Sequence, residues 1–166
     1  MKYLILIRHG QSVWNQQKRF TGWVDIDLTD KGKAEAKKAG ELIKEKKIRF
    51  NSFYSSYQKR ANDTLKIIMK ELNEDENLII KKWQLNERHY GELTGLNKED
   101  MKKKYGEKKI HQFRRSWDVK PGALDKNSPF HPLNIKTYKD IPVSDIPDSE
   151  SLKETHKRVV DCYNEI

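Results

Sequence analysis

Cysteine is almost missing from this chain of 166 residues, which contains Cys162 alone. A single thiol excludes an internal disulfide framework and any zinc site built from several cysteines. Long apolar runs are missing too, because the longest, Tyr3–Ile7, is far too short to cross a bilayer. The sequence contains no charged segment followed by a long apolar stretch, which is the pattern of a secretory signal. These absences predict a cytoplasmic protein with no membrane segment.

Charge, in contrast, is plentiful. Lys and Arg number 34 against 25 Asp and Glu, which leaves a net charge of +9. Such a surplus favours an anionic partner: a phosphorylated metabolite, a nucleic acid or a membrane surface. Only eight of the basic residues are arginines, however, and lysine is the usual residue of a solvated surface. Charge alone therefore leaves the partner open.

The first half of the chain alternates strand-like and helix-like segments. Three segments read as strands: the apolar run at 3–7, residues 50–55 and residues 77–82. Between them, two segments have helical spacing of apolar residues. The first is residues 30–46, with Leu42 on its apolar face, and the second is a helix that Ser56 can cap. This βαβαβ order predicts an α/β fold with a mostly parallel sheet flanked by helices.

The second half is irregular and basic. Residues 97–117 are helical in character with a break at Gly106, and residues 98–120 contain nine basic and four acidic residues. All five prolines fall within 121–147, which predicts a long irregular loop. Helical signals return at Ser151, where Glu154 can complete a capping box. The apolar residues that follow are expected on one inward face of this helix: Leu152, Val159, Val160, Tyr163 and Ile166. We expect one domain over residues 1–166.

Three polar clusters each follow a predicted strand. Residues 8–12 (Arg-His-Gly-Gln-Ser) follow the first, residues 55–60 follow the second, and residues 86–91 come shortly after the third. Open α/β sheets bind ligands at the carboxyl ends of their parallel strands. The clusters are therefore expected to meet at one edge.

His9 is the candidate nucleophile, because a neutral imidazole nitrogen can attack phosphorus and split one transfer into two. Gly10 beside it would allow the backbone to approach a ligand. Arg8, Arg60 and Arg88 are candidate phosphate clamps, since guanidinium offers paired donors and stays charged. A surface ion pair is the alternative for any one of these arginines, and a histidine hydrogen-bonded at a strand end is the alternative for His9.

Glu87 is a candidate general acid or base, and an ion pair that only orients Arg88 is the competing interpretation. Lys98, Arg114 and Arg115 could cover a small anionic substrate or form a nucleic-acid surface, although no nucleic-acid motif is present. Three remaining histidines lack metal-ligand spacing and are expected on the surface: His111, His131 and His156.

These clusters resemble a known family. Residues 8–12 followed by Trp14-Asn15 are similar to the motif of the histidine phosphatase superfamily. Residues 20–23, 28–32, 85–91, 95–98 and 114–115 narrow the resemblance to the cofactor-dependent phosphoglycerate mutases. The resemblance runs from Tyr3 to the end of the chain. It implies a three-layer α/β/α phosphoglycerate mutase-like fold.

The resemblance also implies an activity. His9 would be phosphorylated by 2,3-bisphosphoglycerate, Arg8 and Arg60 would bind the transferring group, and Glu87 would move the proton, with no metal. The reaction would interconvert 3-phosphoglycerate and 2-phosphoglycerate in glycolysis and gluconeogenesis. The implied partners are small phosphorylated three-carbon acids, with no nucleic acid or membrane. A homo-oligomer is possible. The implied substrate-binding positions are Arg8, His9, Gly10, Gln11, Ser12, Val13, Trp14, Asn15, Thr21, Gly22, Arg60, Glu87, Arg88, His89, Tyr90, Lys98, Arg114 and Arg115.

Two positions depart from the family pattern. Gln11 stands where the mutases usually have Glu, and the family's second catalytic histidine, in an Ala-His-Gly-Asn context on a further strand, has no counterpart here. We therefore expect a chain that lacks the C-terminal strand of the fold and has little mutase activity. The alternatives are an inactive phosphate-binding remnant, or a phosphatase or bisphosphoglycerate mutase of the same superfamily.

Overall fold

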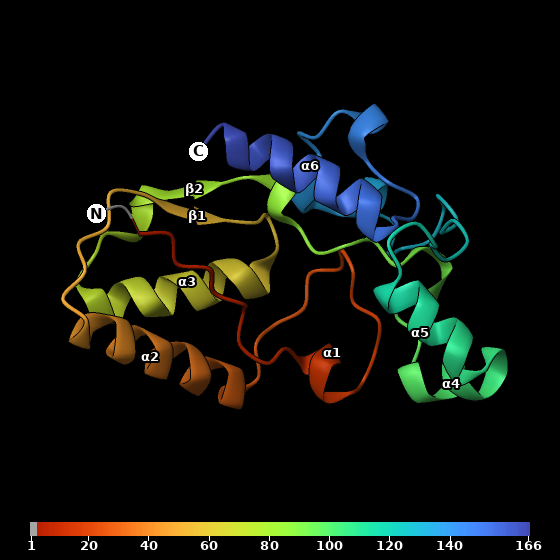
Figure 1. The fold of residues 1–166 in the computed structure, drawn as a ribbon, viewed down its shortest axis with the longest axis horizontal. Coiled ribbons are helices and arrows are strands. Elements are labelled where there is room, and N and C mark those ends of the chain that lie inside the picture. The colour runs from red at the N-terminus through yellow and green to blue at the C-terminus, as the bar shows by residue number, and fades with distance from the viewer. Residues whose placement is uncertain (1–2) are drawn as a thin grey trace.

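The computed structural model describes residues 3–166 and has three layers. Two parallel strands, β1 (Phe53–Ser55) and β2 (Ile79–Lys81), form the sheet, with Phe53 paired to Ile79 and Ser55 to Lys81. Helices α2 (Asp30–Glu45) and α3 (Lys59–Leu72) lie on one side of the sheet, and α6 (Leu152–Asn164) lies on the other (Figure 1). The predicted α/β/α architecture is confirmed.

The predicted strand at residues 3–7 is not formed. Within the described chain none of its backbone groups pairs with β1 or β2, and Tyr3, Leu4 and Leu6 are each more than 60% exposed. A strand needs a hydrogen-bonding neighbour, which an apolar run does not supply by itself. The segment still leads directly into Arg8 and His9, the first residues of the candidate site.

Local capping explains where two of the helices begin. The Thr29 side chain accepts a hydrogen bond from the backbone of Gly32 at the start of α2, and Ser151 and Glu154 form a complete capping box on α6. The expected cap of α3 was wrong. Its N-cap is Gln58, and the Ser56 hydroxyl instead accepts from the Gln58 backbone.

Small residues bring α2 against α3. Gly32, Ala36 and Gly40 form the buried stripe of α2, and a Cβ added to Gly40 would lie 2.9 Å from the Cβ of Glu71 on α3. Leu42, which the helical spacing placed on this face, is 48% exposed. Close helix contact through small side chains therefore replaces the larger apolar face that the spacing predicted.

The second half follows the prediction more closely. Helices α4 (Lys98–Tyr105) and α5 (Glu107–Arg115) are separated by Gly106, whose φ of +83° suits glycine. Residues 121–147 form an irregular segment that contains the 3₁₀ turns η4 (Pro132–Asn134), η5 (Lys136–Tyr138) and η6 (Val143–Asp145).

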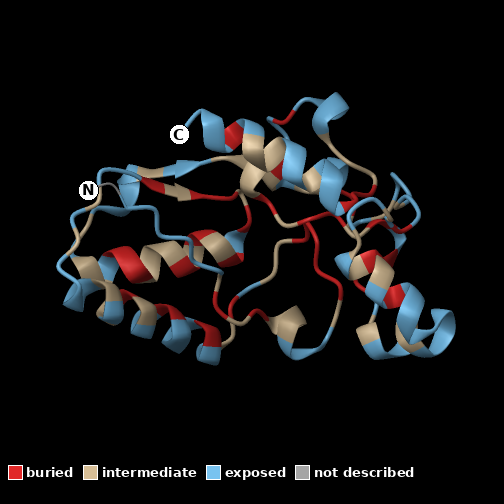
Figure 2. Ribbon diagram, viewed as in Figure 1, coloured by how far each residue is buried: buried red, intermediate tan, exposed pale blue. Residues whose placement is uncertain are grey.

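Two apolar clusters support this half. Phe20 and Leu93 pack with Ile110 and Phe113 of α5, and Trp23 packs with Tyr138 and Ile141 of the irregular segment. Many residues of the loops between these elements are buried, as their red colour in Figure 2 shows. The core thus lies beside the polar clusters and fixes their positions.

The inward face of α6 differs from the expected one. Leu152, Tyr163 and Ile166 were expected on it, but each is at least 40% exposed. Cys162 is buried, and the side chain of Arg158 is 10% exposed. No helix within residues 3–166 is long and apolar enough to span a bilayer.

Candidate active site

His9 lies half-buried just before Gly10, and its two ring nitrogens have different partners. Nδ1 is 2.7 Å from the Gly10 carbonyl oxygen, and Nε2 is 3.2 Å from Nε of Arg60. A carbonyl oxygen only accepts, so Nδ1 carries the hydrogen and Nε2 keeps its lone pair. Burial lowers the pKa of His9 below its usual value, and the charge of Arg60 lowers it further. The imidazole is therefore neutral near pH 7, as a nucleophile requires.

Arg60 is the fixed centre of the site. It is the second residue of α3 and is fully buried. Its guanidinium donates to the backbone carbonyl oxygens of Gly22 (2.9 Å) and Val24 (3.0 Å) and to the Glu87 carboxylate (2.8 Å). Because Arg60 also donates to His9, one rigid fork connects the candidate nucleophile with the candidate acid or base.

Glu87 comes to the site from the loop after η2 (Trp83–Leu85). Its backbone N–H donates to the side chain of Gln58 at 3.2 Å. Its carboxylate contacts Arg60, and its side chain is 36% exposed. Glu87 is therefore the ion-pair partner of Arg60, and the structure does not support the alternative in which Glu87 orients Arg88. One oxygen is held by Arg60 while the group stays open to solvent.

Gly10 has a packing role that the sequence did not indicate. A Cβ at this position would lie 2.2 Å from the carbonyl oxygen of Gly32, so the glycine is needed for close contact with the first turn of α2. Its backbone N–H donates to the hydroxyl of Thr64 on α3. The backbone of Gly10 therefore packs between two helices. This packing holds in place the Gly10 carbonyl oxygen that accepts the hydrogen bond from the His9 ring.

Further cations surround this centre. Lys98 begins α4 and is half-buried. Burial lowers its pKa, and the nearby charges of Arg114 and Arg8 lower it as well. Arg8 itself is exposed, and Arg88 donates to the backbone carbonyl oxygen of Arg114 at 2.5 Å. Positive charge from separate segments therefore converges near His9.

Several buried polar atoms of the selected segments lack partners within the described residues, among them Asn86 Nδ2 and His89 Nε2. Thr21 Oγ1 and Arg88 Nη1 make no hydrogen bond within residues 3–166. Buried polar groups are normally satisfied, so such atoms are candidates for contact with a ligand. They belong to two of the segments that the sequence selected.

The other selected residues take several positions. Ser12 is buried and caps α1 (Val13–Gln16), which contains Val13, Trp14 and Asn15. The backbone N–H of Gln11 donates to Glu35 of α2. Tyr90 is half-buried, and burial raises the pKa of its phenol. Arg115 is exposed at the end of α5.

Two histidines lie deeper than the sequence indicated. His89, selected as a substrate contact, is fully buried, and burial lowers its pKa to about 4. His131 was expected on the surface but is also fully buried, with Nε2 at 2.9 Å from Asp148 and Nδ1 accepting from the Leu133 backbone. His131 caps η4 through a local contact, but its contact with Asp148 comes from 17 positions later, which no local pattern encodes.

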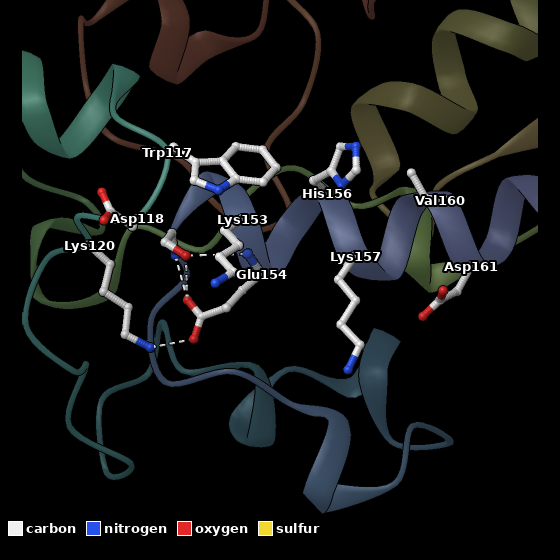
Figure 3. Close-up of a pocket in the computed structure, with 10 residues that line it drawn as sticks. Trp117, Asp118, Lys120, Lys153, Glu154, His156, Lys157, Val160 and Asp161 are labelled. Atoms are coloured by element: carbon white, nitrogen blue, oxygen red, sulfur yellow. Dashed lines mark hydrogen bonds and ion pairs between the residues drawn. The ribbon is translucent and has the colours of Figure 1, made fainter.

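One surface hollow lies away from His9. It is an open groove of about 700 Å³ along the start of α6, where Lys120 pairs with Glu154 at 2.6 Å and Trp117 meets His156 edge to face (Figure 3). Acidic and basic side chains alternate along it, so it shows no preference for an anion. Within the described residues no three His, Cys, Asp or Glu side chains converge as a metal site.

Sequence reasoning missed one buried pair, Glu150 and Arg158. Their side chains are 5% and 10% exposed and meet at 2.6 Å. Glu150 directly precedes the capping box of α6, and Arg158 lies two turns later. The signal available in the sequence was an arginine among the apolar residues of this helix. This pair contacts the backbone on both sides of Glu87.

Comparisons with known proteins agree with this geometry. The family model of the histidine phosphatase superfamily (branch 1) matches residues 4–129. A Pelagibacter ubique protein named 2,3-bisphosphoglycerate-dependent phosphoglycerate mutase is 63% identical over 98% of this chain and 68% of its own length. A Parabacteroides distasonis protein of the same name is 46% identical over all of this chain and 67% of its own length.

Solved structures show the same fold at low identity. A mycobacterial hydrolase matches with a TM-score of 0.69 at 19% identity, over 95% of this chain and 61% of its own. A mycobacterial glucosyl-3-phosphoglycerate phosphatase matches with a TM-score of 0.67 at 19% identity, over 95% of this chain and 59% of its own. The chain thus spans about two thirds of the length of the curated relatives and less of these structures. It belongs to branch 1 of the histidine phosphatase superfamily.

Proposed function

We propose that this chain acts as a 2,3-bisphosphoglycerate-dependent phosphoglycerate mutase, which interconverts 3-phosphoglycerate and 2-phosphoglycerate in glycolysis and gluconeogenesis. The observation that carries the proposal is the neutral His9, whose Nε2 lone pair faces the buried Arg60. The names of the relatives at 63% and 46% identity support the same activity. The proposed setting is the cytoplasm, with small phosphorylated acids rather than nucleic acid as partners.

The side chains near His9 suit a bisphosphorylated acid. Arg8, Arg60, Lys98 and Arg114 bring positive charge, and the free Nη1 of Arg88 adds an unused donor. Guanidinium and ammonium groups match phosphate oxygens, and the fit needs no metal. When bound, 2,3-bisphosphoglycerate supplies the phosphoryl group that primes His9.

The roles of the protein groups follow from their contacts. His9 attacks through Nε2, while its Nδ1–H stays on the Gly10 carbonyl and fixes the ring. Arg60 exchanges its contact with Nε2 for contacts with phosphoryl oxygens and stabilises their charge. Glu87, held by Arg60, takes a proton from the substrate hydroxyl and returns it.

The test is a product analysis. The chain is incubated with 3-phosphoglycerate, with and without 2,3-bisphosphoglycerate, and products are followed by phosphorus NMR. His9→Asn removes the nucleophile, and Lys37→Gln, an exposed change on α2, is the matched control. We expect 2-phosphoglycerate that requires both His9 and the bisphosphate, at a low rate.

The products separate the alternatives. Release of inorganic phosphate from 2,3-bisphosphoglycerate without formation of 2-phosphoglycerate would contradict the mutase proposal and indicate a phosphatase. Binding with no His9-dependent product would indicate a phosphate-binding remnant. Equal activity of His9→Asn and the unmodified chain would exclude the proposed nucleophile.

A further inference from the structure

Arg158 uses every donor it has inside the protein. Nε and Nη2 donate to the two oxygens of Glu150, at 2.6 and 2.8 Å. Nη1 donates to the backbone carbonyl oxygens of Gln84 and Asn86, and Nη2 also donates to that of Glu87, at 3.2 Å. All five guanidinium N–H groups therefore have acceptors, which lysine could not reproduce.

Glu150 holds the other side of the same loop. Its carboxylate accepts from the backbone N–H of His89 at 2.8 Å, and its own N–H donates to the His89 carbonyl oxygen at 3.0 Å. Glu87 is therefore flanked by fixed points: the carbonyls of Asn86 and Glu87 on Arg158, and both backbone groups of His89 on Glu150. The loop between η2 and η3 (Gly91–Leu93) is thus held at Glu87 by Arg158 of α6 and at His89 by Glu150, which lies just before α6.

The pair also supports the other side of the site. The guanidinium of Arg158 lies 5.5 Å from the ring centroid of Trp23, a cation–π distance. Trp23 directly follows Gly22, whose carbonyl oxygen accepts from Arg60 at 2.9 Å. One arginine thus contacts the segment that fixes Arg60 and the segment that presents Glu87.

We propose that Glu150 and Arg158 are positioning residues for the proton-transferring carboxylate, acting through the backbone of residues 84–89 to keep Glu87 on Arg60. This inference rests on the proposed function only for the role of Glu87, because the geometry can be tested without turnover. Buried ion pairs are poor sources of stability, and replacing both partners by apolar residues is often neutral. If the pair serves to position Glu87, replacing it should therefore change the position of Glu87 more than it changes the free energy of unfolding.

The test uses the guanidinium NMR signals of Arg60 in the full chain. Glu87→Gln gives the Arg60 signal without the carboxylate, and the unmodified chain gives the signal with it. Arg158→Lys and Glu150→Gln should each move the Arg60 signal by more than half of that difference. Lys157→Gln, on the exposed face of α6 next to Arg158, should leave it unchanged.

A second variant covers the case in which a single change unfolds the chain. Glu150→Leu with Arg158→Met removes both buried charges, so we expect a folded chain whose Arg60 signal still shifts toward that of Glu87→Gln. An Arg60 signal that stays at its unmodified position in every folded variant would overturn the proposal and leave the pair a structural role.

A separate measurement distinguishes this proposal from the function. Phosphate transfer from 2,3-bisphosphoglycerate to His9 is measured on the unmodified chain and on Arg158→Lys. Because His9 and Arg60 remain in both, we expect transfer in both. Absence of transfer in the unmodified chain contradicts the proposed function, whereas the Arg60 signal alone decides the positioning role.

Discussion

Arg60 is the single side chain on which most of the site geometry depends. It is fully buried and contacts His9, Glu87 and the carbonyls of Gly22 and Val24. Lysine keeps the charge but cannot serve four acceptors from one planar fork. Arg60 helps to keep His9 neutral, holds the Glu87 carboxylate in place and supplies positive charge for a phosphoryl group.

We predict that Arg60→Lys lowers the rate of His9 phosphorylation by about a hundredfold and destabilises the fold by about 3 kcal/mol. The neighbour Lys59 is the control, because it forms exposed ion pairs with Asp27 and Asp63 at 2.6 and 2.8 Å. Lys59→Ala should cost less than about 1 kcal/mol. Labelling kinetics and urea unfolding measure both effects, and equal losses in the two variants would contradict this role of Arg60.

His89 predicts how stability depends on pH. Burial lowers its pKa to about 4 in the folded chain, against the ordinary 6.5. A lowered pKa means that the unfolded state takes up the proton first, so the contribution is complete above pH 6.5 and is lost as the pH falls toward 4. The shift corresponds to about 3 kcal/mol.

We expect the free energy of unfolding to fall over that range, and the fall to be smaller in His89→Gln. Urea denaturation at several pH values measures both slopes. Identical slopes in the two chains would mean that another group carries the dependence.

At the scale of elements, a glycine pair joins the start of α2 to the nucleophile segment. A Cβ on Gly10 would lie 2.2 Å from the Gly32 carbonyl oxygen, and a Cβ on Gly32 would lie 2.1 Å from the Gln11 carbonyl oxygen. Both neighbours are backbone atoms and cannot move aside as a side chain would. The first turn of α2 and the His9 segment therefore fit together only with glycine at both positions.

We predict that Gly10→Ala destabilises the chain by roughly 2 kcal/mol. Lys33→Ala, on the exposed side of the same turn, should change stability by less than about 0.5 kcal/mol. Thermal unfolding compares the two. A Gly10→Ala variant as stable as Lys33→Ala would show that the contact relaxes without cost.

The elements also show what local sequence patterns could predict. Thr29 and Ser151 start α2 and α6 through hydrogen bonds to residues three positions away, so local sequence was sufficient. Strand formation at residues 3–7 depends on a neighbour that the local sequence does not contain. Arg60 and Glu87 were selected with the rule that ligands gather at strand ends. His9 was selected from its imidazole and its Arg-His-Gly motif, although the strand expected before it is not formed.

Residues that act across long distances in the chain escaped prediction. The backbone carbonyl partners of Arg158 lie more than 70 positions earlier, and Asp148, which contacts the buried His131, lies 17 positions after it. The contact of Gly10 with Gly32 also escaped prediction, because it is visible only in three dimensions. Chemistry-bearing residues were therefore easier to find than the residues that hold them in place.

For the whole molecule, the net charge of +9 divides into two groups. Lys98 is half-buried among other cations, whereas lysines such as Lys37 are exposed on helices away from His9. Exposed charges are screened by salt over about 8 Å at physiological ionic strength. A small polyanion should therefore depend mainly on the cations near His9.

We predict that Lys98→Gln weakens 2,3-bisphosphoglycerate binding about tenfold and reduces its dependence on salt, while Lys37→Gln has little effect. Calorimetric titration at low and physiological salt measures both. Equal weakening by the two substitutions would mean that the general positive charge of the surface, rather than the site, binds the anion.

The destination of the phosphoryl group tests the central claim most directly. The full chain is incubated with radiolabelled 2,3-bisphosphoglycerate, digested at neutral pH and mapped by mass spectrometry. We predict an acid-labile phosphate on His9 that is absent in His9→Asn and retained in Lys37→Gln. Label on any other residue, or a chain that binds the bisphosphate but leaves His9 unmodified, would contradict the account.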